Sequence, residues 1–584
     1  MDSRTHNCGE LTKKNLNQTV RLFGWVNSTR THGKIIFIDI RDRFGKTQVV
    51  LNQDSLVEKG KTLSNEDVIS ISGTVIARSK DLINDTLETG EIEISVEELE
   101  VLNVSSALPM SVHDREASNE EHRLKYRYLE LRNAELQRNL IMRHKTTQVV
   151  RNFLTNQNFI EIETPVLTKS TPEGARDYLV PSRVHNGKFY ALPQSPQMYK
   201  QLFMISGLDR YFQIVKCFRD EDLRSDRQPE FTQIDLEMSF VDEEHVRDMV
   251  EQLIITVFKE VNNVKMDMPF PTLSYEEALN RFGTDKPDLR YDIELQNFKP
   301  FSDQSDFKAF KDADSVNMIN VENSEFFSRK IISELDTYAQ SLGAKGLAWM
   351  KYNDSSFEGG ISKFFETKLQ SSIASECNID NNSICFMVAD SAEVSLKVLG
   401  KIRVKIAEML NLCDDSIFKP VWIVDFPLFS WDKDNERFDS VHHPFVAPKD
   451  KDLKIAISDP EKAISKGYDI VINGYEVAGG SIRIHDQELQ QKIFETMSLT
   501  KEDIENKFGF FIDALKFGTP PHGGIAFGLD RLVMLLAGVN NIRDVIAFPK
   551  TTSASALMED SPNTVSDEQL DDLGIGIKEN EKNV

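Results

Sequence analysis

The segment His522-Gly523-Gly524-Ile525-Ala526-Phe527-Gly528-Leu529-Asp530-Arg531 decides the fold of this chain. Ile525 to Phe527 predicts a strand, and the apolar run from Leu532 to Leu536 predicts a helix. Glycines at such a junction let a ligand approach the backbone closely. Arg531 falls in the first helical turn, where the helix dipole disfavours a cation. A residue placed against its local preference indicates an anionic or stacked ligand.

A second arginine-bearing segment, Phe218-Arg219-Asp220-Glu221, lies about 300 residues earlier and continues through Arg224, Arg227 and Gln228. Tyr211 to Phe218 and Phe231 to Phe240 predict two strands, with Arg219 just past the end of the first. A guanidinium there can hold a phosphate or carboxylate through two parallel hydrogen bonds. The alternative is a surface ion pair with Asp220 or Glu221. No GxxxxGK[ST] phosphate-binding loop is present.

Residues 467–485 predict a β-hairpin with an Asn473-Gly474 turn. Asp469 and Glu476 flank this turn and can share a magnesium ion, whose preferred ligands are oxygens. Arg483 ends the second strand. The pair His442-His443 has no Cys or acidic partner at standard zinc spacing, so we expect no zinc site.

The composition describes a globular protein with local charge bias. At 584 residues the chain is too long for one core, so three or four domains are expected. No apolar run approaches the length of a membrane span, and the start has no signal-peptide core. Five irregularly spaced cysteines favour a reducing compartment, which predicts a cytoplasmic protein.

The net charge of −24 argues against a simple nucleic-acid binder. A basic stretch at 121–151 is either a solvated helix face or a phosphate-contacting surface.

The order of segments predicts a multidomain α+β protein. Five short strands in residues 1–105 favour a small Greek-key barrel, of which the OB-fold is the commonest with a nucleic-acid surface. Residues 106–135 form a linker or hinge. A mixed domain occupies 136–287 and resumes at 421–560, so we expect 288–420 to be an inserted domain. Residues 561–584 form a polar, acidic C-terminal tail.

Together, in this order, these segments resemble the class II aminoacyl-tRNA synthetases, and among them the bacterial-type aspartyl-tRNA synthetases of class IIb. Residues 159–165 resemble motif 1, which builds the homodimer interface in the family. Residues 211–240 resemble motif 2, and 523–536 resemble motif 3. The resemblance implies an N-terminal OB-fold barrel for anticodon binding and an antiparallel-sheet catalytic domain. It also implies that the 288–420 insertion is the α+β domain that marks the bacterial type.

The resemblance implies a ligase that activates L-aspartate with ATP and then transfers it to the 3′ end of tRNA(Asp). Such a reaction depends on positioning and on charge neutralisation. Arg219, Glu476 and Arg531 would be the catalytic residues, with Asp469 and Glu476 organising Mg²⁺. The residues implied to bind ATP are Arg219, Asp220, Glu221, Gln228, Glu476, Gly528, Leu529, Asp530 and Arg531.

Aspartate specificity would come from a cationic pocket. The residues implied to bind aspartate are Glu173, Ser195, Gln197, Lys200, Arg219, Asp235, His442 and Arg483. Arg483 and Lys200 would receive the side-chain carboxylate, and His442 would close over it. Asparagine would leave the two cations unsatisfied and so bind several kcal/mol more weakly.

Four residues of the barrel match the anticodon-binding positions of the family, namely Arg30, Phe37, Gln48 and Glu93. Phe37 is the implied stacking platform, worth about 1–3 kcal/mol for a base. Burial in the barrel core is the alternative, but Ile36 and Ile38 alternate with Phe37, which favours a ligand-facing side chain.

The choice of tRNA stays open at this point. Family members restricted to tRNA(Asp) tend to have leucine where His32 stands, and the second position linked to relaxed specificity falls near Asp81. The chain could therefore charge tRNA(Asn) as well. An asparaginyl- or lysyl-tRNA synthetase and a non-catalytic RNA-binding paralogue are also compatible with part of the pattern. The insertion and the Arg483/Lys200 pair argue against the two sister synthetases, and the retained Arg219, Glu476 and Arg531 argue against the paralogue.

Overall fold

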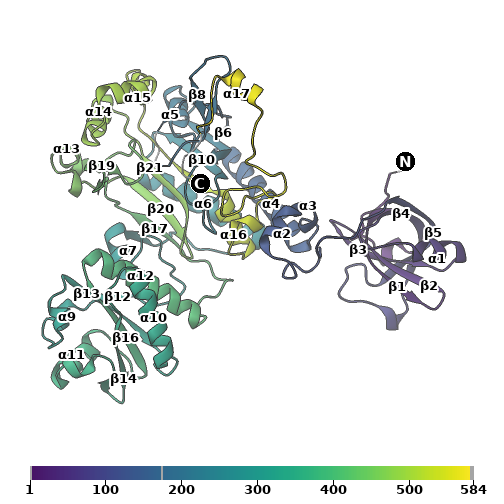
Figure 1. Cartoon of the computed structure of the whole chain (residues 1–584), viewed down its shortest axis with the longest axis horizontal. Coiled ribbons are helices and arrows are strands. Elements are labelled where there is room, and N and C mark those ends of the chain that lie inside the picture. Colours follow the sequence, from purple (N-terminus) through teal and green to yellow (C-terminus); the bar gives the residue numbers. More distant parts are fainter. Residues whose placement is uncertain (1–2, 172–174, 579–584) are drawn as a thin grey trace. The chain divides into compact units, whose positions relative to one another are not determined.

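The computed structural model describes residues 3–171 and 175–578, which divide into two compact units (Figure 1). Among the described residues, unit 1 comprises 3–140 and 556–561, and unit 2 comprises 141–171, 175–555 and 562–578. Within the described ranges, no helix is long and apolar enough to cross a membrane.

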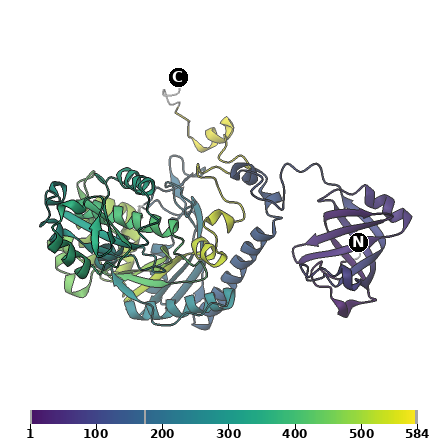
Figure 2. The ribbon, with the colours of Figure 1, turned by 90° about the horizontal axis from the view of Figure 1, so that it is seen from below.

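Unit 1 contains a closed five-stranded barrel, visible side-on in Figure 2. Its elements are β1 (Thr19–His32), β2 (Ile35–Asp42), β3 (Gly45–Leu51), α1 (Asp54–Lys61), β4 (Val68–Ala77) and β5 (Ile92–Asn103). The strand order is β1-β2-β3-β5-β4, with β3 and β5 parallel and the other pairs antiparallel. Alternate residues such as Val20, Ile36 and Ile38 fill the barrel interior. The predicted OB-fold barrel is confirmed.

Helices follow the barrel, and basic residues on and between these helices neutralise buried carboxylates. These helices are α2 (Glu120–Lys125), α3 (Arg127–Glu130) and α4 (Ala134–Asn156). Arg123 and Arg127 contact Glu130, which is 1% exposed, at 2.9 and 2.6 Å. Arg132 contacts Glu66 at 2.7 Å. These members of the basic stretch therefore stabilise unit 1, a role that neither interpretation from the sequence anticipated.

An eight-stranded sheet forms the centre of unit 2, in the order β11-β17-β20-β21-β22-β10-β9-β6. Its strands are β6 (Ile160–Glu161), β9 (Arg210–Phe218), β10 (Glu230–Ser239), β11 (Thr272–Ser274), β17 (Pro420–Val424), β20 (Gly467–Ile472), β21 (Tyr475–Ile482) and β22 (His522–Gly528). All neighbours are antiparallel except β6 with β9 and β11 with β17. The predicted antiparallel-sheet domain is therefore confirmed.

One face of this sheet packs on helices. Apolar residues of α4, of α6 (Glu243–Asn262) and of α16 (Leu529–Ala537) share a core with Ile234, Leu236 and Met238 of β10. Because side chains alternate along a strand, the intervening β10 residues point to the opposite face. The opposite face of the sheet therefore carries polar side chains of β10.

Residues between β11 and β17 form a separate α+β domain. Its elements are α7 (Tyr275–Phe282), β12 (Leu295–Asn297), α8 (Lys299–Ser302), α9 (Lys308–Lys311), β13 (Ser315–Glu322), α10 (Arg329–Ser341), β14 (Ala348–Asn353), β15 (Ser356–Glu358), α11 (Thr367–Glu376), β16 (Ser383–Asp390) and α12 (Ala392–Met409). The sheet runs β12-β13-β16-β14-β15. Residues of α10 and α12 share one core with it, and residues of α8, α9 and α11 share another. The predicted inserted α+β fold is confirmed.

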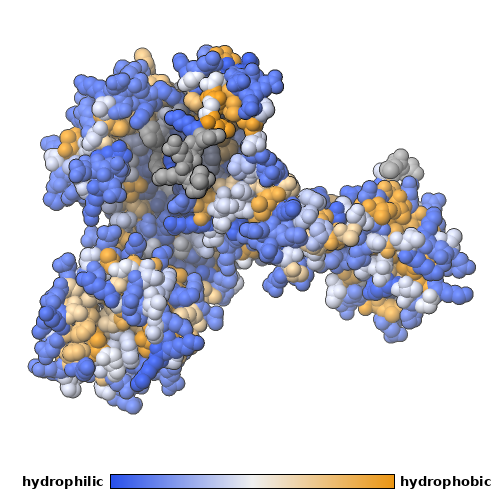
Figure 3. All heavy atoms as spheres, viewed as in Figure 1, coloured by the Kyte–Doolittle hydropathy of each residue, from blue (hydrophilic) through white to orange (hydrophobic). Residues whose placement is uncertain are grey.

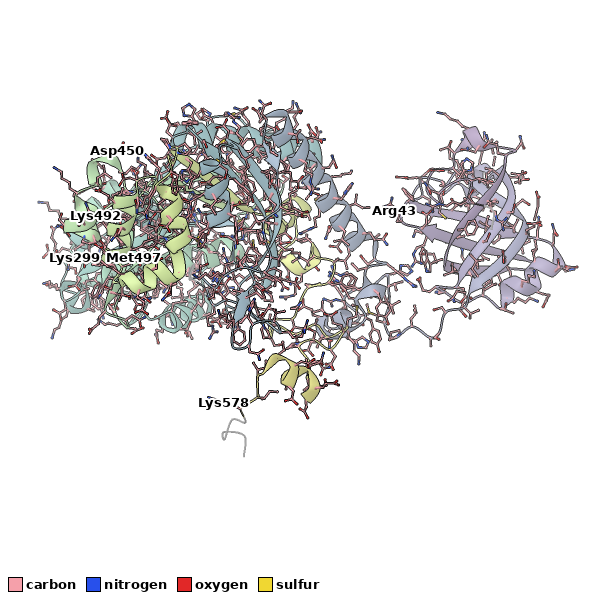
Figure 4. The ribbon with its side chains drawn as sticks, turned by 90° about the horizontal axis from the view of Figure 1, so that it is seen from above. Arg43, Lys299, Asp450, Lys492, Met497 and Lys578 are labelled. Atoms are coloured by element: carbon pink, nitrogen blue, oxygen red, sulfur yellow. The ribbon has the colours of Figure 1, made fainter. Side chains whose placement is uncertain are left out.

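Smaller elements complete unit 2. They are β7 (Leu179–Pro181), β8 (Phe189–Ala191), α5 (Gln197–Ile205), β18 (Phe429–Asp432), β19 (Arg437–Ser440), α13 (Ile455–Ser458), α14 (Gln487–Thr496), α15 (Lys501–Leu515) and α17 (Asp567–Leu573). The tail is thus partly helical, since Ser566 and Gln569 form a capping box on α17. Exposed charged side chains such as Lys492 and Asp450 project from this unit (Figure 4), and most of the face in Figure 3 is hydrophilic.

Candidate active site

The polar face of the large sheet is built by alternation on β10. Phe231, Gln233, Asp235 and Glu237 lie between the core residues of that strand. Their register partners on β22 include Gly528, Ala526 and Gly524. A Cβ on Gly524 would lie 2.1 Å from a Glu237 carboxylate oxygen, so only glycine leaves room for that side chain. Small residues on β22 therefore keep this face open.

Arg219 and Arg531 line the same cavity of about 380 Å³. Arg219 lies just after β9, and Arg531 lies in the first turn of α16. The strands β10 and β22 join these two places because they are neighbours in the sheet. Other lining residues are Glu221, Arg224, Asp226, Arg227, Gln228, Phe231, Gln233, Lys286, Lys401, Gly474, Tyr475, Glu476, Val477, Ala478, Ala526, Gly528, Asp530 and Ile542. The two distant arginine segments thus meet at one site.

Both guanidinium groups are oriented by their surroundings. The Arg219 guanidinium lies over the Phe231 ring at 5.1 Å from its centroid. Arg531 donates to the Glu476 carbonyl and, at 3.1 Å, to the Asp226 carboxylate. The buried Nε atoms of Arg219 and Arg531 have no hydrogen-bond partner among the described residues. A buried donor without a partner is costly, which marks both as able to receive an anionic ligand.

Asp469 and Glu476 approach each other as the hairpin predicted. Asn473 and Gly474 have φ values of 52° and 84° and form the turn. A bulge after Ile470 places Gly479 opposite Asp469. A Cβ on Gly479 would lie 2.7 Å from an Asp469 oxygen and 3.6 Å from a Glu476 oxygen, so both carboxylates converge over this glycine.

The two carboxyl groups differ in their preference for charge. Burial raises the pKa of Asp469, and nearby Glu476 adds to the rise. Burial also acts against charge on Glu476, but Lys286 and Arg531 hold its pKa below the usual value. The convergent oxygens suit a hard cation such as Mg²⁺. Within the described ranges, no group of three or more His, Cys, Asp or Glu side chains could hold a metal ion. The donor set therefore fits a magnesium that takes its remaining ligands from elsewhere.

A buried four-charge cluster lies beside the cavity on the same sheet face. Lys200 donates to Asp235 at 2.6 Å and lies 3.4 Å from Glu237. Arg483 makes two hydrogen bonds to Glu237, at 2.9 and 3.0 Å. The side chains of Lys200 and Arg483 are 2% and 1% exposed. Two cations and two carboxylates therefore balance one another in the interior.

The carboxylates of this cluster respond differently to burial. Burial raises the pKa of Asp235, and Glu237 adds to the rise. For Glu237, burial acts against the charge, but Arg483 and Lys200 hold the pKa below its usual value. Glu237 was missed from the sequence. Its position two residues after Asp235 in a predicted strand was the available signal, because residues i and i+2 share a face.

The two adjacent histidines have separate environments. His442 lies 3.2 Å from Asp469; burial opposes its charge, but Asp469 raises the pKa of His442. His443 lies 2.9 Å from Arg483, and burial together with Arg483 lowers its pKa well below the usual value. His443 is thus a neutral partner for Arg483 that the sequence did not predict.

The other residues expected to bind aspartate lie around α5. Ser195 accepts from the backbone of Gln197 at 3.3 Å, and Gln197 opens the helix. The side-chain amide nitrogen of Gln197 is buried without a hydrogen-bond partner among the described residues. Glu173 lies outside the described residues.

Several residues expected to bind ATP make other contacts. The Gln228 amide is hydrogen-bonded to the backbone of Lys550 at 2.8 and 3.0 Å. Asp530 accepts from Thr232 and from Arg143 at 2.8 and 2.5 Å. Leu529 packs in the core, and Asp220 lies 3.7 Å from Arg176. Glu221, Glu476 and Gly528 line the cavity with the two arginines.

The four residues expected to read the anticodon gather on the outside of the barrel. Arg30 is the register partner of Phe37, which is half-buried between the fully buried Ile36 and Ile38. Arg30 donates to Gln48 at 3.1 Å, and Gln48 donates to Glu93 at 2.7 Å.

Asp39 joins this surface by accepting from Arg30 at 3.1 Å, a residue that the sequence did not single out. His32 is exposed at the end of β1, and Asp81 is exposed in the short turn between β4 and β5. The two residues linked to tRNA choice thus lie at different places of the barrel, one at the end of β1 and one in the short 3₁₀ helix Lys80–Leu82 between β4 and β5.

Comparisons with known proteins place these features in a family. Residues 119–552 match the family described as tRNA synthetases class II (D, K and N), and residues 20–102 match the OB-fold nucleic acid binding domain. The chain is 49% identical to the aspartate–tRNA(Asp/Asn) ligase of Desulfatibacillum aliphaticivorans, covering 98% of each chain. It is 48% identical to the aspartate–tRNA ligase of Staphylococcus saprophyticus, covering 99% of this chain and all of the other.

Solved structures agree on the fold. A putative aspartyl-tRNA synthetase from Leishmania major aligns with a TM-score of 0.59 at 19% identity, covering 97% of this chain and 95% of the other. Asparaginyl-tRNA synthetase from Pyrococcus horikoshii aligns with a TM-score of 0.58 at 20% identity, covering 94% and 99%. The chain therefore belongs to the class II tRNA synthetases, in the family of bacterial-type aspartate–tRNA ligases.

Proposed function

We propose that this protein joins L-aspartate to tRNA, first forming aspartyl-adenylate from ATP with release of diphosphate. The observation that carries the proposal is the convergence of Arg219 and Arg531 on one cavity, beside the buried pair Arg483 and Lys200. The first two suit the phosphates of a nucleotide, and the second two suit an acidic amino acid.

In this proposal, the cavity residues neutralise charge in the first step. Arg219 binds the α-phosphate and the α-carboxylate of aspartate, and Arg531 binds the adenine and the γ-phosphate. Asp469 and Glu476 would hold a magnesium ion, which supplies charge neutralisation on the phosphates. Fixed donors aimed at developing charge can each contribute about 100-fold or more to a rate.

Selection of aspartate follows from the buried cluster. Glu237 accepts from Nε and Nη2 of Arg483, and Ser481 and His443 are the partners of Nη1. A substrate carboxylate that displaced these two partners from Nη1 and also reached Lys200 would be held by two cations. A neutral amide cannot replace that interaction, so asparagine is rejected.

The barrel surface of Arg30, Phe37, Gln48 and Glu93 is the proposed anticodon site. We also propose a homodimer through motif 1, supported by the edge strand β6 and by exposed Ile160, Val166 and Leu167, which are 49, 49 and 52% exposed. A cytoplasmic location stays a prediction from cysteine usage, and the bounds of the six predicted segments stay predictions as well.

The test of the amino acid is ATP–diphosphate exchange with aspartate, asparagine and lysine. We expect exchange with aspartate alone. Comparable exchange with asparagine or lysine would identify a sister specificity, and no exchange with any of them would favour a non-catalytic role.

Charging of tRNA(Asn) is a second candidate activity, favoured by His32 in place of leucine. Aminoacylation of purified tRNA(Asp) and tRNA(Asn), side by side, decides it. Aspartylation of both, with His32→Leu reducing only the tRNA(Asn) product, would establish the relaxed specificity; a product on tRNA(Asp) alone would exclude it.

A further inference from the structure

The hairpin that carries Asp469 and Glu476 ends against the two stems of the inserted domain. At its tip, the Asn473 side chain accepts from the Lys419 backbone at 2.9 Å and donates to the Ile417 carbonyl at 2.8 Å. A Cβ on Gly474 would lie 3.4 Å from the Asp288 Cβ. The turn therefore contacts both the segment that leads into the insertion and the segment that leads out of it.

Charged residues tie these two stems together. Arg290 lies 2.8 Å from the Asp288 carboxylate on the incoming stem and 2.9 Å from Asp415 on the outgoing stem. Arg403 of α12, which is fully buried, donates to the Asp288 carbonyl at 2.7 Å. The stems, the hairpin tip and α12 thus form one connected structure.

This connection brings two lysines to the cavity of Arg219 and Arg531. Lys286 precedes the incoming stem, and Lys401 lies on α12; both line the cavity. The Lys286 ammonium lies 2.7 Å from a Glu476 carboxylate oxygen. An ammonium has three donors, so this contact leaves two for another acceptor. Lys401 is exposed and forms no ion pair with any residue in the described ranges.

The basic residues that line the cavity outnumber the acidic residues that line it. Its cations are Arg219, Arg224, Arg227, Arg531, Lys286 and Lys401, and its acids are Glu221, Asp226, Glu476 and Asp530. Asp530 is paired with Arg143, which is not a lining residue. A polyphosphate is the anion that such a surplus fits, because several charges of one sign must be neutralised over a short distance.

We propose that Lys286 and Lys401 bind the β- and γ-phosphates of ATP, so that Lys401 of the inserted domain and Lys286 just before it complete the triphosphate site. This inference rests on the proposed function and deepens it. The ion pair with Glu476 positions Lys286. The hydrogen bonds between Asn473 and the outgoing stem fix the hairpin, and with it Glu476, relative to the inserted domain. The insertion then contributes to ATP binding directly through Lys401, and indirectly through the stem contacts that position Lys286.

The experiment measures binding of α,β-methylene-ATP with Mg²⁺ to the full chain by titration calorimetry, without aspartate or tRNA. Lys286→Ala is expected to weaken this binding about tenfold, and Lys401→Ala about threefold because its side chain is more solvated. Binding of AMP, which lacks the β- and γ-phosphates, should be unchanged in both. Lys286→Arg should retain most of the affinity.

The matched control is Lys397→Ala, which removes an exposed lysine one turn earlier on α12 that does not line the cavity. It should bind the analogue like the wild type, and all variants should unfold at the wild-type temperature. Wild-type binding of the analogue by both test variants would overturn the inference alone. An equal loss of AMP and analogue binding would also overturn it. If the wild type bound no analogue, the proposed function would fail together with it.

Discussion

The barrel surface and the polar face of the large sheet are both built by alternation of side chains along strands, but they differ in how far their charged side chains are buried. In both, alternate strand residues fill a core and the remaining ones carry polar groups. On the barrel, Arg30 is 58% exposed while it contacts Asp39. On the sheet, Arg483 is 1% exposed while it contacts Glu237. The Arg30 guanidinium therefore remains largely in water, whereas the Arg483 guanidinium is removed from it.

This difference matches the size of the ligands that we propose. An RNA loop approaches from solvent, so a binding residue such as Arg30 can stay accessible. A small acidic substrate is enclosed, so its cations must be balanced by carboxylates before it arrives.

Arg483→Ala should lower the free energy of unfolding of unit 2 by about 3–5 kcal/mol, because it leaves Glu237 buried without its main partner. Chemical denaturation followed by fluorescence measures the change. As a control, Arg437→Ala removes a cation from an exposed pair with Asp439 and should cost at most about 1 kcal/mol. Equal effects of the two substitutions would contradict the contrast.

Arg219→Ala should slow aspartyl-adenylate formation by about 100-fold or more, since it removes a donor to the developing charge. ATP–diphosphate exchange measures this rate. Lys492→Ala, on the exposed side of α14, is the control that should leave it unchanged. Near-normal exchange by the Arg219 variant would remove this residue from the mechanism.

Phe37→Ala should weaken tRNA binding by about 1–3 kcal/mol through lost base stacking. Exchange without tRNA should stay at the wild-type rate, because the substitution is confined to the barrel. Filter binding with cognate tRNA and the exchange assay provide the two readouts. The matched control is Phe44→Ala, which removes a different aromatic side chain of the barrel that is 43% exposed. Equal losses in both variants would argue against a platform at Phe37.

Glu66→Gln should reduce the acid sensitivity of unit 1. Burial acts against charge on Glu66, but hydrogen bonds from Arg41 and Arg132 hold its pKa below the usual value. A lowered pKa in the folded state means stability that is present above the unfolded-state pKa and is lost as the pH falls through the folded-state pKa. Unfolding midpoints measured from pH 6 down to about pH 3 should therefore fall less steeply in the variant. If the unfolding midpoint fell equally steeply with pH in the variant and the wild type, Glu66 would not be the source of the acid sensitivity.

Local patterns predicted much of the fold and part of the site. The strands around Phe37, Tyr211 and Phe231, the Asn473-Gly474 turn and the helix after Gly528 all depend on alternation or on residues suited to one backbone conformation. Glu237, His443 and Lys286 escaped prediction, because their importance comes from partners that are distant in the sequence.

Short-range periodicity and motif order were enough to predict the strands, the turns, the family and the two arginines that we propose bind phosphate. Only the tertiary structure decided that β10, β21 and β22 lie side by side, that Arg483 is neutralised by Glu237, and that Lys286 and Lys401 reach the cavity. The physical reason is that burial and charge pairing depend on which distant segments pack together, and no local pattern encodes that choice.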